Sequence, residues 1–319
     1  MKKYLLPITS IFVSLALLGC SKERYDVLTK DDIIPVVEKQ KFIASSEKIP
    51  EFVSPTTTKK TINNYDIDFQ AAKGTVVRGS VYDFSLLDGQ WVNYPIELEI
   101  QELYTPKDMI LNRKPTVSNG KMLVTGGEVN IIATKDGKPL KLNASSQFSI
   151  QVPATNPDMQ MSVFYGNQQA NGTVNWLLAD SIRVRESFIG RRDSLTTGLV
   201  IDKSSYIVFP TQIGWINCDR FLNDKAPRTH ITFTSEEPSL DAVYIFLYFD
   251  RIKSVIEVYD GKSLEVPVGE HAKVVCFAIT EGKEVYSYFQ DLTVAEGQKV
   301  AVKLEKTTKE EFLKRLEGL

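Results

Sequence analysis

The chain has 319 residues, with 38 Lys and Arg against 40 Asp and Glu, which gives a formal net charge of −2. This slight acidity argues against the basic stripe through which proteins bind nucleic acid, so no nucleic-acid partner is expected. The hydrophobic content of 43% is typical of a globular protein. The length suits two domains, at roughly 100–200 residues per domain.

The first 19 residues have the layout of a secretory signal peptide. A positive start, Met1-Lys2-Lys3, precedes a short apolar run from Ile8 to Leu18, and the small residue Gly19 stands directly before Cys20. A membrane-spanning helix needs roughly 20 apolar residues, more than this run supplies. The pattern therefore predicts an export signal over residues 1–19 rather than a spanning helix.

Leu17-Leu18-Gly19-Cys20 resembles the lipobox of bacterial lipoproteins. The resemblance implies lipid attachment at Cys20, with acyl chains such as palmitate on its sulfur and on the new amino terminus. Several chains anchor stably because each buried methylene contributes about 0.8 kcal/mol. We expect a lipid-anchored protein of the cell envelope, in the outer membrane and facing the periplasm or the surface. The alternative is an ordinary secreted protein with an unmodified cysteine.

Residues 20–60 mix charged residues with Ser, Thr and Pro and contain no long apolar period. Such a composition buries too little apolar surface to fold by itself. We therefore expect a flexible tether, with one short ordered piece around Ile33 to Val37, that lifts the folded body off the membrane.

Cys218 and Cys276 remain once Cys20 carries lipid. Beyond the inner membrane a pair of cysteines can be oxidised to a disulfide. The alternative is two buried free thiols, since free cysteine is among the most buried residue types. Only geometry separates the two outcomes. We expect both residues in or beside the core of the second half.

Residues 61–221 are expected to form a β domain with an extension. Apolar and polar residues alternate over Ile96 to Gln101 and over Phe148 to Val152, as in half-buried strands. Gly126-Gly127 predicts a bulge or a close backbone approach. No helical period is sustained from residue 65 to residue 180. Dipeptides that favour the positive φ angles of tight turns lie between the apolar runs: Asp88-Gly89, Asn119-Gly120, Asp136-Gly137 and Asn171-Gly172.

The segment from Gly74 to Pro153 resembles the ZU5-like module of uncharacterised bacterial lipoproteins. The resemblance covers about a quarter of the chain and implies a β fold rather than an activity. Some eukaryotic ZU5 modules cleave themselves at His-Phe-Ser. Here Gln147-Phe148-Ser149 has glutamine in place of that histidine, so Ser149 lacks an activating base and is expected to be a strand residue. The resemblance rests on Gly74 to Val77, Ile96 to Leu103, Lys107 to Leu111, Ser118 to Leu123 and Thr125 to Val129.

Residues 222–319 are expected to form a small β-sandwich domain that closes with a helix and folds alone. Val243 to Phe249 is apolar on both faces, as in a central strand. Asp260-Gly261 marks a turn, and Thr308 with Glu311 forms a capping box. The apolar face of the following helix contains Phe312, Leu316 and Leu319. The predicted fold is therefore mainly β, with two consecutive β-sandwich-like domains after a flexible N-terminal tether and a short C-terminal helix.

No motif for catalysis, for a cofactor or for a metal stands out. His230 and His271 occur in unrelated contexts, without the spacing of metal ligands. The spacing that begins a calcium-binding loop occurs at Asn64, Asp66 and Asp68. The glycine and the terminal glutamate of such a loop are missing, so we interpret this segment as a turn.

The remaining polar and aromatic features are interpreted structurally. The arginines from Arg183 to Arg192 are expected to be a solvated excursion, with an anion-binding patch as the alternative. Asp219 and Arg220 are expected to form a local pair at the domain junction. Trp91, Trp176 and Trp215 are expected to lie in the core, because large aromatic side chains dominate burial.

Two classes of function follow. The first is a non-enzymatic envelope lipoprotein that presents β domains to a protein or glycan partner, or that scaffolds a complex. The second is a hydrolase, directed at glycan or peptide, whose site is assembled from distant carboxylates or from Ser and His. A deep pocket with convergent titratable groups would favour the hydrolase, and an exposed aromatic patch would favour the binding protein.

Overall fold

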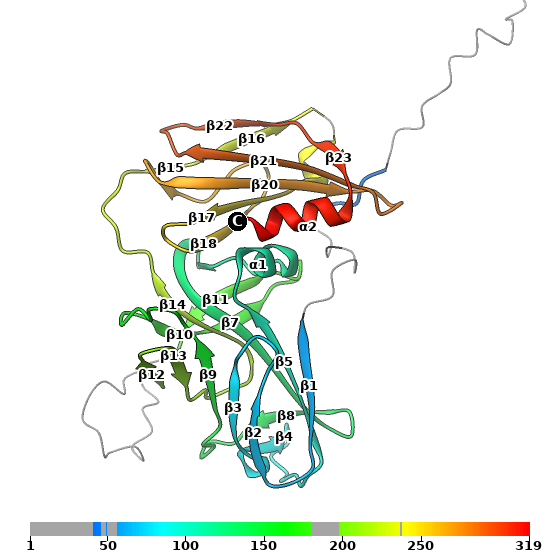
Figure 1. Ribbon diagram of the computed structural model, residues 1–319, viewed down its shortest axis with the longest axis vertical. Coiled ribbons are helices and arrows are strands. Elements are labelled where there is room, and N and C mark those ends of the chain that lie inside the picture. The colour runs from blue at the N-terminus through cyan, green and yellow to red at the C-terminus, as the bar shows by residue number, and fades with distance from the viewer. Residues whose placement is uncertain (1–40, 46–48, 50–55, 180–197, 237) are drawn as a thin grey trace, which may run out of the picture. The chain divides into compact units, whose positions relative to one another are not determined.

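The computed structural model describes residues 41–45, 49, 56–179, 198–236 and 238–319. Residues 41–319 form one compact unit. The predicted mainly β fold is confirmed: two sandwich-like halves follow each other along the chain, and a short helix closes it (Figure 1). Most of the expected tether, including Ile33 to Val37, lies outside the described residues, whereas its last residues already belong to the first strand.

The first half consists of two facing sheets. In the larger sheet the order is β1-β5-β7-β14-β10-β11, with β6 and β8 paired to β7 and β4 paired to β8. Its strands are β1 (Thr57–Ile62), β4 (Phe84–Leu86), β5 (Ile96–Leu103), β6 (Val117–Ser118), β7 (Lys121–Lys135), β8 (Lys138–Leu142), β10 (Ser162–Gln168), β11 (Val174–Leu178) and β14 (Gly214–Phe221). The smaller sheet contains β2 (Asp66–Gln70), β3 (Val76–Ser80), β9 (Ser149–Pro153), β12 (Leu199–Asp202) and β13 (Ser205–Val208).

A core between these sheets holds the first half together. The predicted alternation is confirmed on β5 and β9, where Ile96, Leu98, Ile100, Ile150 and Val152 are buried in one cluster. Because strand side chains alternate between faces, one face of β5 lies in this core and the other faces outward.

The predicted turns have the backbone that their residues favour. Asn119 and Gly120 have φ of 48° and 75°, and Asp136 and Gly137 have φ of 50° and 74°. The close approach predicted at the diglycine is also present. A Cβ on Gly126 would lie 2.7 Å from the Tyr206 ring and 2.8 Å from the Cys218 carbonyl oxygen.

A short helix that the sequence did not predict, α1 (Pro106–Asn112), follows β5. Thr105 caps it: its hydroxyl accepts from the Asp108 N–H at 3.1 Å, and the Asp108 carboxylate accepts in return from the Thr105 N–H at 3.0 Å. Arg113 ends the helix in the left-handed conformation, with φ of 52°. A helix of seven residues is too short to show a 3.6-residue period, so the capping box was its signal.

The second half is a sandwich built on the sheet β18-β17-β20-β21-β23. As predicted, β17 is central: it pairs with β18 and β20 and is buried on both faces. The elements are β15 (Arg228–Thr229), β16 (Thr232–Ser235), β17 (Tyr244–Phe249), β18 (Ser254–Val258), β19 (Val266–Pro267), β20 (His271–Ile279), β21 (Val285–Thr293), β22 (Lys299–Val302), β23 (Glu305–Thr307) and α2 (Lys309–Glu317), with 3₁₀ turns η2 (Val81–Asp83) in the first half and η4 (Leu240–Ala242) in the second.

The predicted closing helix is confirmed as α2. The Thr308 hydroxyl accepts from the Glu311 N–H at 3.1 Å, and Phe312 and Leu316 are buried. Only this half of the predicted capping box forms, because the Glu311 carboxylate accepts from the Thr307 hydroxyl at 3.1 Å instead.

The two halves share part of their core. Leu103, Met109 and Ile110 of the first half join Tyr244, Phe246, Phe277 and Phe312 of the second in a single buried cluster. Figure 1 shows α1 beside α2, and Lys107 of α1 reaches Glu317 of α2 at 2.6 Å. The expectation that the second half folds alone stays a prediction, although on this face its core includes residues of the first half.

A buried ion pair crosses the same junction. Arg113 lies 2.6 Å from Glu257 of β18, and their side chains are only 4% and 3% exposed. Backbone hydrogen bonds run beside it, from the Thr116 N–H to the Val255 carbonyl at 2.7 Å and from the Thr125 N–H to the Lys253 carbonyl at 3.1 Å. The junction is thus closed by apolar contacts, by a charge pair and by backbone pairing.

Candidate functional site

The residue expected to carry lipid, Cys20, lies outside the described residues, as do the arginines from Arg183 to Arg192. In the part of the chain that the structure describes, no helix is long and apolar enough to cross a membrane.

Cys218 and Cys276 are both free and buried, so the structure contains the free-thiol alternative and no bridge between them. They lie in different cores: Cys218 in the core of the first half and Cys276 in that of the second. The expectation that both belong to the second half is therefore wrong for Cys218, because β14 completes the large sheet of the first half. Burial raises the pKa of both thiols, so neither is an activated nucleophile.

The histidines make ordinary contacts. His230 Nδ1 lies 2.8 Å from the Ser263 carbonyl oxygen, and His271 Nδ1 lies 3.4 Å from Asp250 Oδ1. Ser149 is a strand residue on β9, as expected. Among the described residues, no group of three or more His, Cys, Asp or Glu could hold a metal ion.

The tryptophans do not all lie in the core. Trp176 is fully buried and Trp215 is partly buried against it, as predicted. Trp91 is 69% exposed, which makes the expectation of a core residue wrong. Its backbone bridges Ser85 of β4, while the next residue, Val92, turns inward and is buried. Strand alternation therefore places the indole outside.

Three exposed tyrosines gather at one end of the first sandwich. The rings of Tyr65 and Tyr82 stack at 5.2 Å with an angle of 21° between their planes. Tyr94 meets Tyr65 edge-on at 4.9 Å and 89°. The three side chains are 47%, 50% and 40% exposed. We call Tyr65, Tyr82 and Tyr94 the tyrosine cluster.

Tight backbone geometry supports the tyrosine cluster. Tyr65 lies in the turn between β1 and β2, and Tyr82 in the short turn η2. The Asp83 carboxylate fixes η2 because it accepts from the Ser80 N–H at 2.8 Å and from the Gln147 N–H. The Val81 N–H donates to the Tyr65 carbonyl at 2.9 Å, which ties the two segments together. The rings are thus held in place before any partner arrives.

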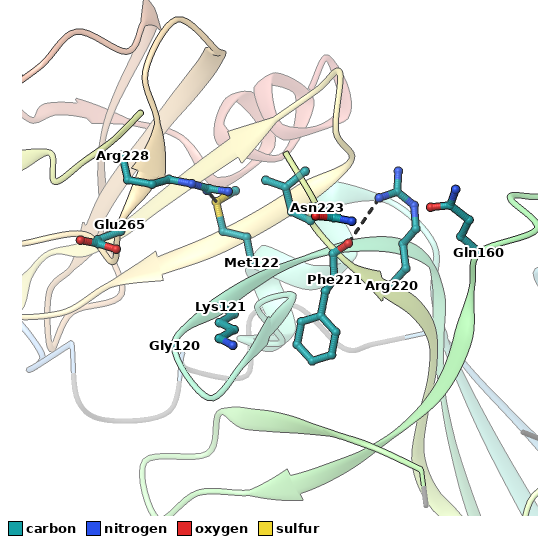
Figure 2. A pocket seen from close by; sticks show the side chains of 10 residues that line it. Gly120, Lys121, Met122, Gln160, Arg220, Phe221, Asn223, Arg228 and Glu265 are labelled. Atoms are coloured by element: carbon teal, nitrogen blue, oxygen red, sulfur yellow. Dashed lines mark hydrogen bonds between the residues drawn. The ribbon is translucent and has the colours of Figure 1, made fainter. Parts of the chain in front are cut away.

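Two hollows lie where the halves meet, and Arg220 of β14 lines both. The linker hollow, of about 520 Å³, includes Lys121, Met122, Gln160 and Arg228 (Figure 2). The larger junction hollow, of about 570 Å³, lies between α1, β7 and the segment that joins β17 to β18.

Two arginines that line these hollows form ion pairs. Arg220 Nε lies 2.6 Å from Asp158 Oδ2, and Arg228 Nη2 lies 2.9 Å from Asp224 Oδ1. The pKa of Asp158 is lowered by the hydrogen bond from the Gln160 N–H and by that from Arg220. The expected local pair of Asp219 with Arg220 does not form, because consecutive residues face opposite sides of β14 and Arg220 pairs with Asp158 instead.

Asp219 belongs to a buried polar group next to the junction hollow. Asn217 Nδ2 donates to Asp219 Oδ2 at 2.7 Å and lies 3.5 Å from Glu128 Oε1. Burial raises the pKa of both carboxyls, and the nearby Asp219 carboxyl raises that of Glu128 further. Neither side chain is exposed to solvent, so this pair cannot meet a substrate in this conformation.

Comparisons with known proteins assign no family. No family model matches the chain, and no curated protein matches it. Among solved structures, a γ-CGTase from alkalophilic Bacillus clarkii aligns with 8% identity and a TM-score of 0.17. The alignment covers 78% of this chain and 41% of that one.

Proposed function

We propose that this chain is a lipid-anchored lipoprotein of the bacterial cell envelope whose β body binds glycan without acting on it. The lipobox-like stretch that ends at Cys20 supports the anchor, and the resemblance to ZU5-like modules of lipoproteins agrees with it. The observation that carries the binding function is the tyrosine cluster.

Exposed aromatic faces suit a sugar ring. The face of an aromatic ring is electron-rich, and the C–H bonds on one side of a pyranose are weakly positive, so the two stack. Tyrosine adds a hydroxyl that can hydrogen-bond to the sugar. The tyrosine cluster offers three such rings in a fixed arrangement.

The surroundings favour a glycan over a protein partner. Exposed polar residues lie next to two of the tyrosines along the chain: Asn63, Asn64 and Asp66 beside Tyr65, and Asn93 beside Tyr94. The cores of protein–protein interfaces are depleted in charged residues. Amide and carboxylate groups beside aromatic rings instead match the hydroxyls of a saccharide.

The hydrolase alternative receives less support. A glycosidase needs a carboxyl of raised pKa that faces the substrate, next to an ionised one. Asp158, which lines the open junction hollow, has a lowered pKa, and the carboxyls of raised pKa at Glu128 and Asp219 are buried.

A glycan array probed with a chain that begins at Ser21 tests the proposal. Tyr82→Ala removes one face of the stacked pair and should weaken binding of a captured glycan by about 2 kcal/mol, roughly thirtyfold. Met159→Ala is the control, because it removes an apolar side chain that is 74% exposed elsewhere on the surface. No bound glycan would reject glycan binding, and equal weakening by both variants would reject the tyrosine cluster as its site. Turnover of a bound glycan would move the protein to the hydrolases.

A further inference from the structure

A second site is carried by the junction hollow, which is separate from the tyrosine cluster. Its volume of about 570 Å³ falls within the roughly 300–1,000 Å³ of small-molecule sites, and such sites occur preferentially where two domains meet. We propose that the junction hollow binds a small anionic amphiphile, meaning a molecule with one carboxylate or phosphate group and a short apolar body.

The acidic groups of the hollow are already engaged. Asp158 is held by Arg220 at 2.6 Å and by the Gln160 N–H at 2.9 Å. Asp250 accepts from the Arg251 N–H at 2.8 Å and lies 3.4 Å from His271 Nδ1. Arg220 therefore neutralises Asp158, whereas Asp250 has no Lys or Arg partner among the described residues. The three cations of the lining, Arg220, Arg251 and Lys253, still outnumber its two carboxylates.

The groups that remain are hydrogen-bond donors. Among the described residues, the side chains of Arg251 and Lys253 have no acidic partner, and the Tyr248 hydroxyl has no hydrogen-bond partner. All three residues line the hollow. Two cations without an acidic partner and a phenol on the short segment from Tyr248 to Lys253 favour an anion, because charge-assisted hydrogen bonds are the stronger ones.

The backbone of this segment is fixed in place. Lys253 has a left-handed backbone with φ of 49°, and its carbonyl accepts from the Thr125 N–H of β7 at 3.1 Å. The segment that carries Arg251 and Lys253 is therefore bonded to the opposite half instead of standing free. Donors held in position lose less entropy when a ligand binds.

The lining also contains apolar side chains. They belong to Pro106 and Met109 of the α1 region, Val124 of β7 and Met161. Methionine fits ligands of varied shape because its side chain is flexible and polarizable. An anionic head at the cations and an apolar body against these apolar side chains would match both kinds of lining residue at once.

Calorimetric titration of a chain that begins at Ser21 tests the proposal with four probes: octanoate, octyl phosphate, 1-octanol and inorganic phosphate. We expect octanoate or octyl phosphate to bind at least about tenfold more tightly than 1-octanol, since the neutral probe lacks the charge-assisted bonds. Inorganic phosphate should also bind more weakly, because it has no apolar body. Preference between the two anions then identifies carboxylate or phosphate as the recognised group.

Variants locate the site. Arg251→Gln and Lys253→Gln should each weaken binding about tenfold, and Tyr248→Phe should weaken it less. The matched control is Lys283→Gln, since Lys283 is also an exposed turn lysine with positive φ, 64°, but does not line the hollow. Thermal unfolding confirms that each variant is folded. Equal affinity for 1-octanol, no binding of either anion, or an equal loss in the control would overturn the proposal.

Discussion

The tyrosine cluster and the junction around Arg113 differ in how deeply their side chains are buried. At the junction Arg113 and Glu257 are buried against each other, and Tyr259 adds its hydroxyl to Glu257 at 2.8 Å. At the cluster the rings of Tyr65 and Tyr82 meet but keep about half of their surface exposed. The polar groups at the junction stabilise the fold, whereas the tyrosine cluster leaves aromatic surface exposed for a partner. Substitutions should therefore separate stability at the first from binding at the second.

The largest effect is expected at the buried pair. Arg113→Leu leaves Glu257 buried without its partner, which should lower the free energy of unfolding by about 3–5 kcal/mol. Urea denaturation measures it. Arg78→Leu is the control, because the Arg78–Asp68 pair spans 3.6 Å and its side chains are 53% and 73% exposed. The double variant Arg113→Leu with Glu257→Leu should recover most of the loss. A small effect of the single variant would show that the junction does not depend on this pair.

The next effect depends on pH. Because burial raises the pKa of Glu128 and Asp219, the folded state keeps protons that the unfolded state releases above about pH 4. Their contribution to stability is complete below that pH and is lost as pH rises toward the folded pKa, at up to about 1.4 kcal/mol per pH unit for each proton. Urea denaturation from pH 4 to 8 should show this decline, and Asp219→Asn should flatten it. An unchanged slope in Asp219→Asn would mean that this carboxyl is already ionised.

A smaller effect on stability is expected at the tyrosine cluster. Tyr82→Ala removes a half-exposed ring, so the free energy of unfolding should change by no more than about 0.5 kcal/mol, while binding of a captured glycan weakens roughly thirtyfold. Urea denaturation and titration on the same preparation measure both quantities. If Tyr82→Ala proves as destabilising as Arg113→Leu, the cluster is part of the fold and the contrast between the two regions fails.

The sequence predicted the elements better than it predicted the surfaces. Alternation on β5, the Asn119-Gly120 turn and the Thr308 cap are local signals, and each has its expected structure. The prediction that Trp91 lies in the core was wrong, because the exposure of a side chain depends on which face of its strand packs on the core. The tyrosine cluster unites residues from three separate turns, and only the folded backbone brings them together.

The junction escaped prediction for a similar reason. The Arg113–Glu257 pair joins residues 144 positions apart, and no local pattern marks such a contact. Helix α1, which packs against part of the second half's core, has only seven residues, so its capping box is its one signal in the sequence. The assignment of residues 61–221 and 222–319 to separate domains stays a prediction, which expression of 222–319 alone would test.

The two buried cysteines should differ between the folded and the unfolded protein in their reactivity. Since Cys218 and Cys276 are free, buried and of raised thiol pKa, neither should react with iodoacetamide in the native protein, and both should react after unfolding without reductant. Mass spectrometry counts the added groups. A linked peptide pair in the non-reduced sample would contradict the two free thiols.

The last substitution should leave the fold and both proposed sites intact and change only where the protein resides. Cys20→Ser removes the sulfur to which lipid would be attached, so the protein should leave the membrane fraction and lose incorporation of labelled palmitate. Its unfolding curve and glycan binding should match those of a chain that begins at Ser21. Cys276→Ser is the matched control, because it removes a cysteine of the second core and should keep the label. A Cys20→Ser protein that still takes up label and stays with the membrane would reject the anchor, while the tyrosine cluster would remain to be judged by its own titration.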